Sequence, residues 1–145
     1  MQTLRMNEGK IEIPKGWEDK TIHVLSCPVG AKEPGASFSV TRSHLGEKTG
    51  LKVYIDKQLV EMAKIFPRFS MISRDEVTVD GAEAEHLVFT WRSEKGGTLR
   101  QEQTVVMLPG EKVLVLTGTA RKDAYHLYAD AFCDMVTKFR FNRDL

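Results

Sequence analysis

Residues 98–120 read TLRQEQTVVMLPGEKVLVLTGTA, and this stretch determines the kind of sheet that the chain forms. Two runs rich in β-branched and apolar residues flank Pro109-Gly110, a pair that suits a type II turn, so we expect antiparallel strands at 98–108 and 111–120. In the segment KVLVL, residues 112–116, apolar side chains point to both faces of the sheet. A helix can cover one face, while the other needs a second subunit or an apolar partner. This surplus of apolar surface favours a binding module over an enzyme.

Turn signals on the N-terminal side extend this hairpin into a four-strand meander. Asp80-Gly81 is a strong two-residue hairpin signal between strands expected at 69–79 and 82–92, and Gly96-Gly97 makes the following turn. Three shorter strands are expected earlier, at 10–13, 21–27 and 37–42, and the first of them stops at a proline.

Two helices complete the predicted fold. In residues 51–66 an apolar stripe recurs at spacings of three and four, with Thr49 as the expected N-cap and Pro67 after the last turn. The second helix is expected over 122–138, and its main apolar stripe consists of Tyr128, Ala131, Met135 and Phe139. The prediction is therefore an α+β fold, an antiparallel, strongly twisted sheet packed with two main helices, in one domain spanning residues 1–145.

Composition excludes several classes of function. The 145 residues include 21 basic and 20 acidic ones, a net charge of +1, so neither a nucleic acid nor an anionic membrane is an expected partner. The longest apolar runs are too short to span a bilayer and residues 1–10 lack a signal-peptide core, so we expect a cytoplasmic protein that is not itself a membrane protein. In that reducing compartment Cys27 and Cys133 are expected to be free, buried thiols.

No catalytic or metal-binding pattern emerges from the sequence. The four histidines do not form an HxH or HExxH arrangement, and there is no nucleophile elbow or phosphate loop. Glu83 and Glu85 stand two apart, which we interpret as a solvated patch rather than an acid/base pair. We therefore expect no catalytic residue, no metal and no cofactor.

Glutamines interrupt the apolar pattern of residues 98–108. Gln101 and Gln103 share a strand face with Leu99 and Val105, which is unusual both for a pure core and for a pure solvent face. One interpretation is a half-exposed edge or interface strand. The other is an apolar groove dotted with amides, formed together with Gln58, Ile22, Val24, Phe38 and Val40, that accepts a hydrophobic helix whose backbone is already internally satisfied.

The run IEIPKGWED, residues 11–19, followed by a strand, resembles the opening of the DcrB-related family. The later order agrees with it: a helix ending near Phe66-Pro67, a meander containing Leu108-Pro109-Gly110, and a C-terminal helix. The resemblance covers nearly the whole chain and implies a Mog1/PsbP-like fold. Within the family, a short member without a lipoprotein signal is similar to the Eag-type chaperones of bacterial type VI secretion.

That resemblance implies a function and a set of site residues. Eag-type chaperones are homodimers that bind the N-terminal transmembrane segments of effectors and help to load them on a secreted spike protein. Carried over by position, the glutamine pair would be Gln58 and Gln103. The apolar groove would consist of Ile22, Val24, Val40, Leu99, Val105 and Leu114.

Two other interpretations remain open from the sequence. One is a non-enzymatic regulatory module that binds a folded protein partner such as a small GTPase, as other proteins of this fold type do. The second is an enzyme or ligand carrier with a cavity around Cys27 and His86.

Overall fold

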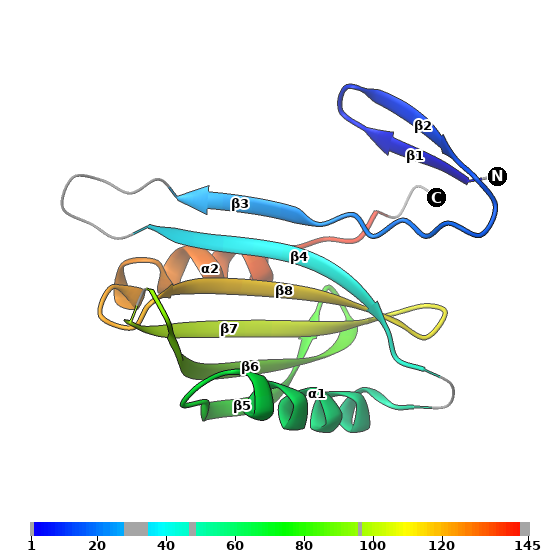
Figure 1. The fold of residues 1–145 in the computed structure, drawn as a ribbon. Coiled ribbons are helices and arrows are strands. Elements are labelled where there is room, and N and C mark those ends of the chain that lie inside the picture. The colour runs from blue at the N-terminus through cyan, green and yellow to red at the C-terminus, as the bar shows by residue number, and fades with distance from the viewer. Residues whose placement is uncertain (1, 28–34, 47–48, 96, 143–145) are drawn as a thin grey trace.

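The computed structural model describes residues 2–27, 35–46, 49–95 and 97–142. Within these residues, six strands form the main sheet: β3 (His23–Cys27), β4 (Ala36–His44), β5 (Ser70–Val79), β6 (Ala82–Ser93), β7 (Gly97–Leu108) and β8 (Lys112–Arg121). Their spatial order is β3-β4-β8-β7-β6-β5, and every neighbouring pair is antiparallel (Figure 1). The predicted meander of four strands is confirmed as β5 to β8.

The turns of the meander have the backbone geometry that the sequence predicts. Asp80 and Gly81 have φ angles of 47° and 84°, and two positive φ values in succession are what a type I′ hairpin turn requires. Gly110 also has a positive φ, 80°, as expected for the glycine of a Pro-Gly turn.

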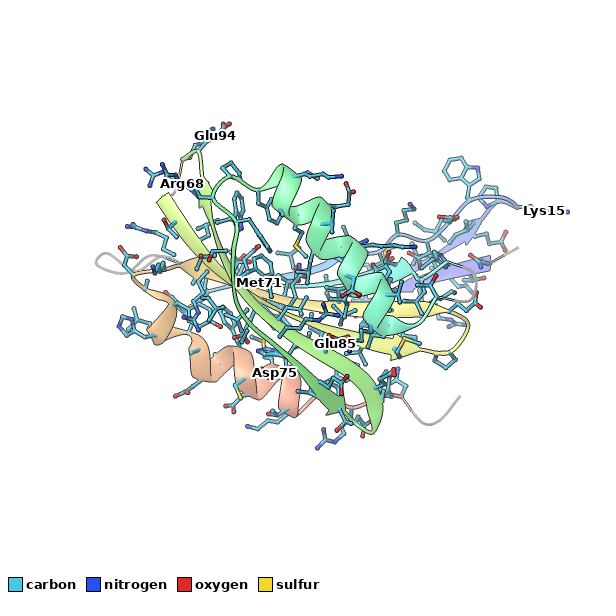
Figure 2. The ribbon with its side chains drawn as sticks, turned by 90° about the horizontal axis from the view of Figure 1, so that it is seen from below. Lys15, Arg68, Met71, Asp75, Glu85 and Glu94 are labelled. Atoms are coloured by element: carbon cyan, nitrogen blue, oxygen red, sulfur yellow. The ribbon has the colours of Figure 1, made fainter. Side chains whose placement is uncertain are left out.

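The two helices lie on opposite faces of the sheet (Figures 1 and 2). The first, α1 (Leu51–Ile65), packs its buried side on residues of the central strands such as Leu87, Phe89 and Val113. The second, α2 (Ala129–Thr137), inserts Phe132 into a core with Val106 and Leu116. The expected α+β class is confirmed, and each face has a separate apolar cluster.

One glycine is required by this packing. A Cβ at Gly118 of β8 would lie 2.7 Å from the ring of Phe132, closer than real Cβ atoms approach a carbon. The missing side chain therefore lets α2 approach the sheet.

The C-terminal helix differs from the prediction of 122–138. The chain forms a 3₁₀ turn, η1 (Tyr125–Leu127), before α2 begins at Ala129. Tyr125 and Tyr128 are both buried, and a three-residue period of inward side chains suits a 3₁₀ turn. Because this turn shifts the phase of the following helix, Phe132 is buried while Ala131 and Cys133 are exposed.

Three smaller expectations are also corrected. Cys27, like Cys133, is exposed, so both cysteines are free thiols but neither is buried. The N-cap of α1 is Gly50 rather than Thr49. A strand that the sequence did not suggest, β1 (Gln2–Met6), pairs with β2 (Gly9–Ile13) in a separate two-stranded sheet.

Candidate functional site

The face of the sheet that carries α1 is only partly covered by it. The strand register aligns one row of side chains across this face: Val24 lies opposite Ser39, Ser39 opposite Thr117, and Thr117 opposite Gln103. Val24 and Ser39 lie on β3 and β4, at the edge of the sheet where no helix of the described residues packs on this face. We call the part of this face over β3 and β4 the open half, and it adjoins the flank of α1.

A hollow of about 330 Å³ lies where this open half meets α1. It brings Gln58 of α1 and Gln103 of β7 to one site, as the resemblance implies. Apolar side chains and two hydroxyls complete it: Tyr54, Ile55, Met62 and Phe66 from α1, and Thr41, Ser43, Leu87, Val105 and Val115 from the sheet. The site is thus an apolar groove with amides on both sides.

The register distinguishes the two glutamines of β7. The Gln101 carboxamide accepts a hydrogen bond from Trp91 Nε1 at 2.9 Å and donates one to Thr119 Oγ1 at 2.8 Å. Neither Gln58 nor Gln103 makes a side-chain hydrogen bond to any residue that the structure describes. Gln103, and not Gln101, is therefore the glutamine available to a bound molecule.

Three other predicted residues also belong to this face, and Ile22 precedes its outermost strand. Val105 is buried in the floor of the hollow, and Leu99 is half-buried farther along the same side of β7. Val24 is 62% exposed on β3, and Ile22, just before that strand, is 60% exposed. Val24 thus lies at the outer rim of the open half.

Val40 and Leu114 do not belong to this face, so the predicted grouping of eight residues is wrong for these two. Both pack in the cluster under α2, together with Phe38. Because side chains alternate along a strand, a shift of one residue moves a position to the opposite face. Their neighbours Thr41 and Val115 occupy the groove instead.

A row of hydroxyl side chains on this face was missed from the sequence. Their sequence signal is alternation, a hydroxyl residue at every second position of β4 from Ser37 to Ser43 and at Thr117 and Thr119 of β8. The register pairs Ser37 with Thr119 and Ser39 with Thr117, whereas Thr41 and Ser43 lie opposite valines. The row consists of Ser37, Ser39, Thr41 and Ser43 on β4, and Thr117 and Thr119 on β8.

An ionic cluster fixes α1 against the other side of this face. Arg74 of β5 reaches Glu85 of β6 through Nε and Asp56 of α1 through Nη1, both at 2.6 Å, and donates through Nη2 to the Lys52 carbonyl at 3.1 Å. Hydrogen bonds to Glu85 and then to Asp56 raise the pKa of Arg74. Glu85 is buried beside the N-terminal half of α1 (Figure 2), so the expectation that Glu83 and Glu85 form a solvated patch is wrong for Glu85.

The opposite face has a second hollow, of about 540 Å³, between α2 and the meander. His86, Glu102 and Cys133 are among its lining residues, and His86 Nδ1 lies 2.9 Å from Thr104 Oγ1. Cys27 lies on the distant edge strand, so the structure does not bring it to His86. The described residues contain no group of three or more potential metal ligands.

Comparison with known proteins gives one family match. The DcrB family model matches residues 8–132, which is most of the chain. Effector EagT6 of Pseudomonas aeruginosa strain PAO1 is 25% identical over 126 residues, covering 87% of this chain and 88% of that protein.

Solved structures agree on the fold. A crystal structure of PA94 from Pseudomonas aeruginosa, a protein of unknown function described as a putative regulator, superposes with a TM-score of 0.86 at 24% identity, covering 98% of this chain and 97% of that one. The Ran-binding protein Mog1p of Saccharomyces cerevisiae gives a TM-score of 0.52 at 13% identity over 94% and 88%. The Mog1/PsbP-like fold is thereby confirmed. No helix among the described residues is long and apolar enough to cross a membrane.

Proposed function

Because the chain belongs to the DcrB family, we propose that it is a non-enzymatic chaperone of a type VI secretion system. It binds and shields the N-terminal transmembrane segments of an effector and aids the loading of that effector on the spike protein. Likeness to EagT6 over most of both chains supports this proposal, as does the resemblance to Eag-type chaperones.

The observation that carries the proposal is the groove beside α1, in which Gln58 and Gln103, without a side-chain hydrogen bond to any described residue, stand among apolar side chains. A transmembrane helix in water exposes apolar surface at a cost of about 25 cal/mol per Å², which the groove relieves. The backbone of the transmembrane helix is already hydrogen-bonded internally, so the groove needs few polar contacts to orient the helix. Two amides can supply these contacts at a modest desolvation cost.

The proposed function also implies a compartment, an oligomeric state and the absence of catalytic chemistry. The client is bound before secretion, so the chaperone works in the cytoplasm, and it acts as a homodimer. Shielding and handover need no covalent chemistry, so no catalytic residue, metal or cofactor takes part.

A pair of valine substitutions tests the proposal. Val24, at the rim of the groove, is 62% exposed, and Val60, on the outer side of α1, is 54% exposed. Glutamate at either site should leave the fold intact, but only Val24→Glu places a charge where the client would lie. The probe is a leucine/alanine helix of about 20 residues fused to the N-terminus of a soluble carrier and coexpressed without detergent.

We expect the wild-type chain and Val60→Glu to keep the fusion soluble and to copurify with it, and Val24→Glu to do neither. Purification from the source cells, followed by mass spectrometry, then identifies the natural client. Failure of the wild-type chain to keep the fusion soluble would contradict the proposal. Recovery of only folded, soluble partners would favour the regulatory module.

A further inference from the structure

The floor beside α1 consists of short side chains over the width of three strands. Two successive rows of the register cross β3, β4 and β8 on this face, and every residue in them is a serine, a threonine or a valine. The rows are Val24–Ser39–Thr117 and Ser26–Ser37–Thr119. A helix laid on this floor therefore meets hydroxyl groups rather than long aliphatic side chains.

Three of these hydroxyls have no partner within the described protein. Thr119 Oγ1 already accepts a hydrogen bond from the Gln101 amide at 2.8 Å. Ser39, Thr117 and Thr41, which lines the hollow, are half-buried and make no side-chain hydrogen bond to any residue that the structure describes. A helix that covers the floor separates these hydroxyls from solvent, so each of them then needs a new acceptor.

A helix can supply such acceptors only if its backbone comes close to the floor. Each helical carbonyl accepts one hydrogen bond within its own helix and keeps a second lone pair, to which a serine or threonine hydroxyl can donate. Glycine, alanine and serine on the facing side allow this approach, as they do between helices in membranes. Leucine or phenylalanine there would hold the carbonyls out of reach and leave the hydroxyls buried without an acceptor.

We propose that the groove selects its client by a stripe of glycine, alanine or serine along one face of the helix, and that Ser39, Thr41 and Thr117 determine this specificity. The inference rests on the proposed function and names the kind of transmembrane segment that the groove binds. The stripe repeats at spacings of three and four, because these positions share one face of a helix. A helix with large side chains on every face is rejected, since it leaves polar groups of the floor unpaired.

The floor is long enough for about three turns of such a helix. Over Ser37 to Ser43 the strand β4 rises by about 20 Å, and β8 pairs with it along this whole length (Figure 1). A helix rises 1.5 Å per residue, so about 13 residues of the client lie over the floor. At spacings of three and four, this length holds a stripe of about four small residues.

Two helices of identical composition test the selection. Each is a segment of about 20 leucine and alanine residues fused to the N-terminus of the same soluble carrier. In one the alanines form a single stripe, and in the other they are spread evenly around the helix. The two fusions carry different tags and are coexpressed with a limiting amount of the chain. We expect the wild-type chain to recover the striped fusion at least about tenfold over the dispersed one.

A matched pair of double variants tests whether the hydroxyls cause the preference. Thr41→Val combined with Thr117→Val keeps the size of both side chains but removes their hydroxyls, so the preference should fall below about threefold. Thr41→Ser combined with Thr117→Ser keeps the hydroxyls and should keep the tenfold preference of the wild type. Circular dichroism checks that both double variants are folded.

The outcomes separate this inference from the proposed function. Equal recovery of the two fusions by the wild type, or an unchanged preference in the double valine variant, would overturn the selection by hydroxyls. Either result would leave the chaperone function standing, because the helices are still bound. Recovery of neither fusion by the wild type would contradict the function and the inference together.

Discussion

Gln101 and Gln103 lie two residues apart on the same side of β7, but they have different surroundings. Gln101 bridges Trp91 and Thr119, so its amide is part of the folded structure. Gln103 faces the groove opposite Gln58 and makes no such bridge within the described chain. The two side chains should therefore differ, Gln101 contributing to stability and Gln103 to the proposed binding.

We expect Gln101→Leu to lower the free energy of unfolding by about 1–3 kcal/mol, because it leaves the indole N–H of Trp91 without its acceptor. Gln103→Leu should change stability by less than about 0.5 kcal/mol but weaken retention of the helical fusion. Urea unfolding and the coexpression assay measure the two effects. Equal loss of stability in both variants would contradict the different roles.

Tyr125 gives the protein a predictable response to alkali. Burial and then a hydrogen bond from its hydroxyl to Glu102 raise the pKa of Tyr125 above its ordinary value of 10.0. The fold therefore favours the protonated phenol more than the unfolded chain does. This contribution is complete below pH 10 and is lost progressively as the pH rises above it.

We expect the free energy of unfolding of the wild type to fall more steeply above pH 10 than that of Tyr125→Phe, which has no group to titrate at this position. Urea unfolding at several pH values between 8 and 11 measures the difference. Parallel curves for the two proteins would show that Tyr125 titrates alike in the folded and unfolded chains.

At the scale of elements, α1 is fixed at its two sides in different ways. Apolar packing holds it on the sheet, and Arg74 ties it to β5 and β6. The Glu85 side chain is only 6% exposed, whereas that of Asp56 is 56% exposed. The two halves of this ionic cluster should therefore differ in their contribution to stability.

Arg74→Gln should lower the free energy of unfolding by about 3–5 kcal/mol, because it leaves the buried Glu85 carboxylate without its counter-charge. Asp56→Asn should cost less than about 1 kcal/mol, since solvent screens that pair. Adding Glu85→Gln to Arg74→Gln should recover part of the loss. A double-mutant cycle in urea checks all three values.

Periodicity predicted the elements that are long and regular. The meander and α1 follow from alternation, turn residues and a spacing of three and four, and their ends agree with the structure to within about two residues. The η1–α2 break was missed because Tyr128 and Phe132 also fit one continuous helix. The strand β1 was missed because its pattern, QTLRM, is short and has few apolar residues.

The sequence predicted the helix and strands that form the candidate site, but not which face of each strand carries every residue. Gln58 and Gln103 meet as expected, because the helix and strand that hold them were identified correctly. Val40 and Leu114 were placed on the wrong face, since a one-residue shift exchanges the two faces of a strand. The hydroxyl row was not predicted, because serine and threonine on a strand are equally typical of a solvated surface.

At the scale of the whole molecule, the two faces of the sheet are covered to different extents. The face under α2 carries a continuous apolar cluster. The face under α1 is closed over β6 and β7 and open over β3 and β4. Both apolar clusters should therefore contribute to stability, and the proposed binding should depend on the open part of the second face.

This division predicts opposite results for two glutamate substitutions. Leu114→Glu buries a charge under α2 and should prevent folding or lower the melting temperature by more than about 10 °C. Val24→Glu, at the exposed rim, should change the melting temperature by less than about 2 °C. Thermal unfolding followed by circular dichroism compares them. A stable Leu114→Glu variant would contradict the burial of Leu114 in the cluster under α2.

The hydroxyl row on β4 and β8 determines how the empty groove behaves in water. A floor of valine and leucine alone would shed its hydration and adhere to any other apolar surface. Serine and threonine should keep this floor hydrated and so limit adhesion of the unoccupied groove to other apolar surfaces. If a helix binds as proposed, calorimetry should record a negative change in heat capacity that is smaller than an all-aliphatic floor of the same area would give.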